Sequence, residues 1–161
     1  MMNKTAIYPG TFDPLTMGHI DLIQRSLSIF DEVIIAVAAS SKKQPLFSVE
    51  ERIQLIKDSI HGLDGARVDT FDSLLVHYAK DRSSVAIIRG LRAISDFEYE
   101  LQMALMNRRL DSTVETVFMM PSEEYTFLSS SLVKEVASFG GSLQGLVPEA
   151  VERSLKETFR K

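Results

Sequence analysis

Cysteine is absent from this chain of 161 residues, so disulfides, thiol nucleophiles and thiolate metal sites are excluded. The longest uninterrupted apolar run, residues 33–39, is too short to cross a bilayer. The first residues also lack the apolar stretch and the small-residue cleavage site of a signal peptide. These absences favour a cytoplasmic protein that does not contact a membrane.

A surplus of basic residues is missing as well. The chain carries 18 Lys and Arg against 22 Asp and Glu, which gives a net charge of −4. Because a basic stripe normally binds the backbone of a nucleic acid, we expect no nucleic-acid partner. Short basic groups occur at 42–43, at Arg89 and Arg92, and at 108–109, and they suit a small phosphorylated ligand.

The remaining composition is that of an ordinary globular protein. Hydrophobic residues make up 45% of the chain and no low-complexity tract interrupts it, so we expect a single domain over residues 1–161. Short apolar runs predict strands at 5–9, 33–38, 66–71, 85–88 and 114–120. Helical spacing of apolar residues predicts helices at 20–30, 48–60, 73–82, 97–110, 129–139 and 148–160.

Local signals support three of these helices. Ser48 and Glu51 have the spacing of a capping box at the start of the second helix. Pro148 is expected at the first position of the last helix. The fourth and longest helix has an apolar stripe made of Phe97, Leu101, Leu105, Met106 and Leu110.

Strands and helices alternate along the whole chain. This order predicts an α/β fold with an open, doubly wound, mostly parallel five-stranded sheet and helices on both faces. In such sheets ligands bind beyond the carboxyl ends of the strands, at the point where the strand order reverses. The residues that follow each strand are therefore the candidates for function.

The segment Tyr8–His19 follows the first strand and combines two glycines with two prolines. Gly10 permits close approach of a ligand to the main chain, and Gly18 does the same at the start of the helix. The free N–H groups of that first turn attract anions, and His19 can add a ring N–H. A glycine- and proline-rich turn with a capping histidine is the alternative, but we favour a phosphate site.

Basic residues follow the second and fourth strands. Residues 40–45 form a loop with two lysines, although a solvated loop charge is the better interpretation of a lysine taken alone. Arg89, Gly90 and Arg92 follow the fourth strand, and arginine makes paired charge-assisted bonds to phosphate. An ion pair with Asp96 or Glu98 is the competing explanation of Arg92.

Three serines, Ser129–Ser131, follow the loop after the fifth strand. One serine suffices to cap the next helix, which leaves two hydroxyls and the backbone amides for a phosphate chain. Glu100, on the helix after the arginine pair, stays undecided between a solvent-facing charge and a role in the site. If the first and fourth strands are neighbours, these groups face one another across a single crevice that attracts an anion.

The chemistry of this crevice is limited by what it lacks. It offers no covalent nucleophile, no metal-binding cluster and no Walker A motif. Positioning and charge stabilisation remain, and phosphorus-transfer reactions rely largely on them. A phosphate acceptor is already anionic at neutral pH and needs no general base, so nucleotidyl transfer onto a phosphomonoester fits best.

Several motifs together carry a resemblance to a known family. The sequence Thr16-Met17-Gly18-His19 is similar to the T/H-x-G-H signature of the nucleotidyltransferase superfamily. The order and spacing from about residue 6 to 148 resemble the bacterial phosphopantetheine adenylyltransferases, through four segments: 8–14, 88–92, 96–100 and 129–136. The resemblance implies a Rossmann-like nucleotidyltransferase fold.

The resemblance also implies a reaction and a set of contacts. ATP would react with 4′-phosphopantetheine by direct in-line displacement, with Mg²⁺, to give dephospho-coenzyme A and pyrophosphate, in a homohexamer. His19 would be catalytic and stabilise the α-phosphate in the transition state. The acceptor would be bound by Thr11, Lys43, Leu75 and Arg89. ATP would be bound by Thr11, Phe12, His19, Gly90, Leu91, Arg92, Glu100, Tyr125, Thr126, Phe127, Leu128, Ser129, Ser130 and Ser131.

The sequence departs from the family pattern at three positions. Met17 stands where asparagine is frequent, but this position of the signature is variable. Tyr125 replaces a frequent tryptophan and Leu128 replaces a frequent isoleucine, and both keep an aromatic or apolar character. Two alternatives stay open. The same chemistry could serve nicotinate mononucleotide, or glycerol phosphate with CTP, and a nucleotide-sensing module without catalysis could share the fold.

Overall fold

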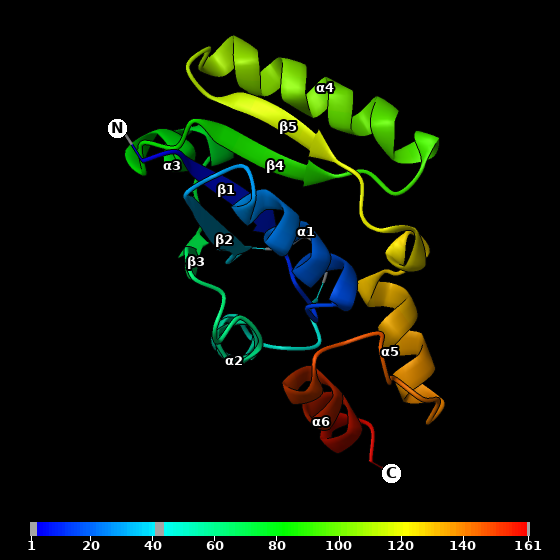
Figure 1. Cartoon of the computed structure of the whole chain (residues 1–161). Coiled ribbons are helices and arrows are strands. Elements are labelled where there is room, and N and C mark those ends of the chain that lie inside the picture. Colours follow the sequence, from blue (N-terminus) through cyan, green and yellow to red (C-terminus); the bar gives the residue numbers. More distant parts are fainter. Residues whose placement is uncertain (1–2, 41–43, 161) are drawn as a thin grey trace.

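The computed structural model describes residues 3–40 and 44–160 (Figure 1). Its single sheet has the order β3-β2-β1-β4-β5, and every neighbouring pair is parallel. The strands are β1 (Thr5–Gly10), β2 (Glu32–Ala38), β3 (Ala66–Phe71), β4 (Ala86–Gly90) and β5 (Glu115–Met119). The predicted open, parallel, five-stranded α/β sheet is therefore confirmed.

Six helices connect and follow these strands. They are α1 (Met17–Leu27), α2 (Val49–Ser59), α3 (Leu75–Asp81), α4 (Ile94–Leu110), α5 (Ser130–Ser138) and α6 (Glu149–Thr158), with a 3₁₀ turn at Glu123–Tyr125. The capping box of Ser48 and Glu51 is present. Pro148 was expected at the first position of α6 but lies at its N-cap, one residue earlier, because a residue without a backbone N–H is tolerated at either position. None of the helices in the described ranges is long and apolar enough to cross a membrane.

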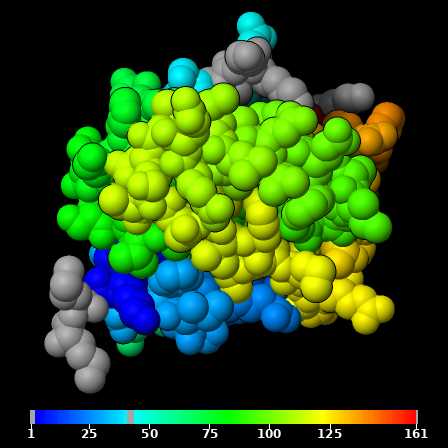
Figure 2. Space-filling view, turned by 90° about the horizontal axis from the view of Figure 1, so that it is seen from above, coloured from blue at the N-terminus to red at the C-terminus, as the bar shows by residue number. Residues whose placement is uncertain are grey.

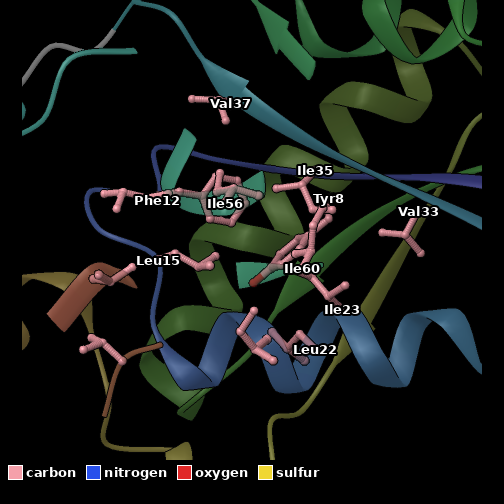
Figure 3. Packing of buried hydrophobic residues seen from close by; sticks show 14 of the residues in the cluster. Tyr8, Phe12, Leu15, Leu22, Ile23, Val33, Ile35, Val37, Ile56 and Ile60 are labelled. Carbon is pink, nitrogen blue, oxygen red and sulfur yellow. The ribbon is translucent and has the colours of Figure 1, made fainter. Parts of the chain in front are cut away.

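The sheet is covered on both faces, as continuous apolar strands require. Tyr8 and Ile35 point into a large core with α1, α2, α5 and α6, which Figure 3 shows from close by. Their neighbours Ile7 and Ile34 point the other way, into a smaller core built on α3. This alternation fixes the register of the strands, since a slip of one residue would exchange the two faces.

Helix α4 differs from this pattern. The predicted helix forms, but its apolar stripe is not buried within the chain: Phe97 is 42% exposed and Leu105 is 55% exposed. The buried residues of α4 are instead the polar Glu100 and Asn107. Figure 2, which looks onto α4, shows this helix at the surface.

The strand order reverses beside β1. The chain moves from β1 to β2 and β3 on one side, then returns to place β4 on the other side of β1. The carboxyl ends of β1 and β4 therefore diverge into different loops at adjacent positions, which meets the condition under which their residues face one another across a single crevice. This is where a doubly wound sheet binds its ligand.

Candidate active site

Two adjoining cavities open beyond the carboxyl ends of β1 and β4. The larger has a volume of about 330 Å³ and the smaller about 240 Å³. Both are lined by Phe12, His19, Ser130 and Ser131, so these four residues lie at the junction. A site built from two joined cavities can hold two substrates side by side.

The loop after β1 reaches this junction in an unusual backbone conformation. Phe12 has a φ of 50°, in the left-handed region, and its side chain is only 3% exposed. Its ring meets those of Tyr8 and His19 edge-on, at centroid distances of 5.4 and 5.1 Å. A Cβ at Gly10 would lie 3.0 Å from the Phe12 ring, so Gly10 is small because of this ring as well as because of a ligand. The loop is thus shaped by its own core packing.

His19 lies in the first turn of α1, and its ring is held in a defined orientation. The backbone N–H of Thr16 donates to Nδ1 of His19 at 2.9 Å, while the Thr16 hydroxyl accepts from the His19 N–H at 3.4 Å. This capping box uses histidine at the position where glutamate is usual. Since Nδ1 accepts a hydrogen bond, the ring proton resides on Nε2. The structural capping role and the ligand role of His19 are therefore compatible.

The same surroundings hold His19 neutral. Burial and, to a lesser degree, the charge of Arg92 lower the pKa of His19 from 6.5 to about 4. At neutral pH the ring is an uncharged hydrogen-bond donor through Nε2. It can stabilise negative charge without transferring a proton.

This depressed pKa predicts a specific pH dependence of stability. Between pH 6.5 and 4 the unfolded chain binds a proton at His19 that the folded chain does not, so stability falls as pH is lowered. From pH 7 to pH 5 the loss attributable to His19 should be about 2 kcal/mol. Urea unfolding of the wild type and of His19→Asn at both pH values measures it as a difference. If the unfolding free energies of the two proteins fell equally between pH 7 and pH 5, the lowered pKa of His19 would be contradicted.

Arg89 and Glu100 form a bidentate ion pair at the edge of the larger cavity. Two guanidinium nitrogens of Arg89 donate to the two carboxylate oxygens of Glu100 at 2.7 and 2.6 Å. Burial lowers the pKa of Arg89, but the hydrogen bonds and the charge of Glu100 outweigh it and raise that pKa. Glu100 is 9% exposed, so the solvent-facing interpretation is wrong. It lies opposite the end of β4, where Arg89 requires a partner.

Arg92 also lines the larger cavity. The competing explanation, an ion pair with a nearby carboxylate, applies to it in part. Its Nε lies 3.6 Å from the carboxylate of Asp96, and its Nη1 donates to the Leu128 carbonyl at 3.2 Å. The ion pair is long and nearly half of the arginine side chain is exposed, so its contribution to stability is small. The guanidinium stays available to an anion in the cavity.

The three serines at the start of α5 are not equivalent. Ser129 caps the helix by accepting from the Leu132 N–H at 3.1 Å. Ser130 donates its hydroxyl hydrogen to the Pro14 carbonyl at 2.7 Å, so the expectation of two free hydroxyls is wrong for Ser130. This bond ties α5 to the loop after β1. Within the described residues, only Ser131 of the three makes no side-chain hydrogen bond.

The structure brings most, but not all, of the predicted residues to the cavities. Gly90, Tyr125 and Leu128 line the larger cavity, and Thr11 lines the smaller one. Four predicted residues line neither of the two: Leu75, Leu91, Thr126 and Phe127. Leu75 packs partly against the smaller core. Lys43 lies outside the described residues.

Three charged residues near the site escaped the sequence analysis. Lys134 and Asp13 line the smaller cavity and form an ion pair at 2.9 Å. Burial raises the pKa of Asp13, but hydrogen bonds from Lys134 and from two backbone amides lower it overall. Arg52 is 1% exposed and bonds to the loop after β1. Its position between Val49 and Ile56 on the buried stripe of α2 was a signal that could have revealed it.

No protein metal site is evident in the described ranges, where no three histidine or carboxylate side chains cluster. The carboxylates that line the larger cavity, Asp96 and Glu100, are paired with arginines.

Comparisons with known proteins show the family and the fold of the chain. Residues 7–136 match the cytidylyltransferase-like family. The chain is 59% identical to a phosphopantetheine adenylyltransferase of Thermodesulfovibrio yellowstonii, over 99% of this chain and 100% of that protein. A crystal structure from Vibrio parahaemolyticus, assigned as a nicotinate-nucleotide adenylyltransferase, superposes with a TM-score of 0.71 at 18% identity. It covers 98% of this chain and 95% of its own, and it shows the shared fold alone.

Proposed function

The chain belongs to the phosphopantetheine adenylyltransferases of the cytidylyltransferase-like family, and we propose that it transfers the adenylyl group of ATP to 4′-phosphopantetheine. The products are dephospho-coenzyme A and pyrophosphate. The observation that carries the proposal is the position of His19 at the junction of two cavities, with Nε2 as its donor atom. Both substrates are intracellular metabolites, so we place the reaction in the cytoplasm.

The larger cavity suits ATP. The N-termini of α1 and α5 both reach its wall through Gly18 and Ser130, and backbone N–H groups at helix N-termini attract phosphate. Arg92 adds a positive charge from the loop after β4. Together these groups support a position of the phosphate chain of ATP against His19.

The reaction needs no base from the protein. A phosphate oxygen of the acceptor attacks the α-phosphorus of ATP, a new P–O bond forms, and the bond to the bridging oxygen of the β-phosphate breaks. Pyrophosphate departs with that electron pair. Nε2–H of His19 donates to an oxygen of the α-phosphate as its charge grows, and Arg92 supplies fixed positive charge. The acceptor phosphate is largely dianionic at pH 7, so it attacks without losing a proton.

Mg²⁺ belongs to the nucleotide in this proposal. Because the carboxylates that line the larger cavity are engaged with arginines, phosphate oxygens and water would supply the ligands of Mg²⁺. The ion would neutralise part of the charge of the triphosphate and of the departing pyrophosphate.

Release of pyrophosphate tests the proposed function. With ATP and Mg²⁺, 4′-phosphopantetheine should support much faster release than nicotinate mononucleotide, and CTP with glycerol phosphate should support none. Equal or faster release with another acceptor would reassign the substrate. ATP binding without turnover on any acceptor would favour a nucleotide-sensing module instead.

Gly18→Ala should separate ligand binding from stability. A Cβ at Gly18 would lie 3.6 Å from the Cβ of Tyr125 and 3.5 Å from the Thr16 hydroxyl, both ordinary contacts. Alanine in the first turn should leave the unfolding free energy unchanged or raise it by up to about 1 kcal/mol. The added methyl group narrows the larger cavity, so the Kd for ATP should rise roughly tenfold or more. Calorimetric titration with ATP and urea unfolding measure the two effects, and unchanged ATP affinity would remove Gly18 from the nucleotide site.

A homohexamer is the assembly that we propose, and the exposed apolar residues of α4 support contact between copies. Large apolar residues on more than one side of this helix are 37–93% exposed: Ile94, Phe97, Leu101, Met103, Leu105, Met106 and Leu110. A single chain rarely exposes so many large apolar residues on one helix without a partner. The number of copies comes from the family resemblance.

Substitution on α4 tests this assembly. Light scattering of the wild type should give the mass of six 18.1-kDa chains. Leu105→Glu should lower that mass, because a carboxylate buried between copies would lose its hydration. Ile29→Glu is the matched control, since Ile29 is 58% exposed but lies after α1. A monomeric wild type, or an unchanged mass for Leu105→Glu, would contradict the proposal.

A further inference from the structure

Arg52 is a buried cation that the proposed reaction does not use. Its side chain lies on the inner face of α2 and the residue is 1% exposed. Within the described residues, all of its hydrogen bonds go to backbone carbonyls and none to a carboxylate. Burying a charge without a counter-ion is costly, whereas an apolar side chain would fill a core position without that cost.

The bonds of Arg52 lie directly beyond the last pair of the β1–β2 ladder. This ladder ends at the pair Gly10 and Val37. Nη1 of Arg52 bridges the next residue on each side, donating to the Thr11 carbonyl at 2.7 Å and to the carbonyl of Ala38, the last residue of β2, at 3.2 Å. One nitrogen therefore ties the loop after β1 to the end of β2.

A second set of bonds holds the segment that precedes α2. Nε of Arg52 donates to the carbonyls of Phe47 and Ser48 at 3.2 and 3.3 Å. From the other side, the carboxylate of Asp13 accepts from the N–H groups of Leu46 and Phe47 at 2.8 and 2.9 Å. Two N–H groups of the segment 46–48 thus bond directly to the loop after β1. Two of its carbonyls are joined to the same loop through Arg52.

Both sets of bonds converge on the wall of the smaller cavity. Thr11 and Asp13 line that cavity together with Gln44 and Pro45, and His19 forms its junction with the larger one. Thr11 is an exposed residue that lines this cavity, and its carbonyl accepts a hydrogen bond from Arg52. A shift of this carbonyl would move the Thr11 hydroxyl relative to His19.

We infer that Arg52, assisted by Asp13, is a positioning residue that sets Thr11 and the wall of the smaller cavity relative to His19. Its contribution to turnover is made through Thr11, without contact with either substrate. The inference rests on the proposed adenylyl transfer, since it assigns Thr11 to the transfer step. It predicts that loss of the guanidinium lowers kcat while the larger cavity keeps its affinity for ATP.

A double-mutant cycle with Thr11 tests this inference. Arg52→Lys keeps the charge but cannot bridge the same carbonyls, and kcat should fall about 10²-fold while the Kd for ATP changes less than about threefold. In a Thr11→Ala background the same substitution should lower kcat by less than about threefold. Any loss of thermal stability should be equal in the two backgrounds. Arg67→Lys is the control, because Arg67 pairs with Glu32 and lines neither cavity, and it should leave kcat unchanged.

Two results would overturn the inference. One is a kcat for folded Arg52→Lys within threefold of the wild type, and the other is an equal loss of kcat in both Thr11 backgrounds. If Arg52→Lys does not fold, Asp13→Asn loosens the same segment from its other side and is judged by the same two criteria. Absence of turnover in the unaltered protein would instead contradict the proposed function, so the two failures are distinguishable.

Discussion

His19→Ala is expected to lower kcat by roughly 10²–10⁴-fold while ATP binding largely survives. The ring is held by the Thr16 N–H, so that Nε2 presents one fixed donor to the junction of the cavities. A donor aimed at charge that grows only in the transition state contributes to turnover and little to ground-state binding. Single-turnover formation of product and calorimetric titration with ATP measure the two quantities.

The His19 variant should remain folded. Alanine removes one half of the capping box, which costs about 1 kcal/mol, and the Thr16 hydroxyl can still accept from the backbone N–H of residue 19. His77→Ala is the matched control, since His77 is an exposed residue of α3 outside both cavities. Near-normal turnover of His19→Ala, or an equal loss in His77→Ala, would remove His19 from its assigned role.

Arg89→Met is expected to act on both stability and function. It leaves the carboxylate of Glu100 buried without its partner, which should lower the unfolding free energy by roughly 3 kcal/mol. It also removes a cation at the edge of the larger cavity that the family resemblance assigns to the phosphate of the acceptor. The KM for 4′-phosphopantetheine should therefore rise at least tenfold, with a smaller change for ATP.

A second substitution separates these two effects. In Arg89→Met/Glu100→Gln the unpaired charge is gone, so most of the lost stability should return while the acceptor KM stays high. Urea unfolding and steady-state kinetics of both variants give the comparison. Recovery of the acceptor KM in the double variant would show that Arg89 acts only as the partner of Glu100. A changed ATP affinity with an unchanged acceptor affinity would contradict its placement.

The fold followed from the sequence because its strands are short, apolar and regularly separated by helices. The burial of β1, β2 and β4 on both faces is what their unbroken apolar runs require. The interiors of the helices were equally predictable from the sequence, and only the residues at their ends differed from the prediction. The contact between β1 and β4, which was only a condition at the level of sequence, is present in the order β3-β2-β1-β4-β5 and brings the separate strand-end motifs into one site.

Other features depended on contacts that sequence spacing does not encode. The pairing of Glu100 with Arg89 requires α4 to lie across the end of β4, and a charge on a helix gives no sign of this. The bond from Ser130 to Pro14 crosses 116 positions of the chain. The exposed stripe of α4 has a helical period like that of a buried stripe, because spacing identifies a helix but not what covers it.

Arg52 is a case in which local spacing held usable information. It lies three residues after Val49 and four before Ile56, on the same face of α2 as those apolar residues. A charge on a buried face requires a set of polar partners, so the position itself could have indicated a polar contact within the core. The identity of those partners, the carbonyls of Thr11 and Ala38, could come only from the fold.

The central claim is that one site performs a single direct displacement at the α-phosphorus of ATP. Reaction of 4′-phosphopantetheine with ATP that carries a chiral sulfur substitution at the α-phosphate tests it most directly. One in-line displacement predicts dephospho-coenzyme A with an inverted configuration at that phosphorus, which ³¹P NMR can determine. Retention of configuration would require two displacements through a covalent intermediate and would contradict the claim.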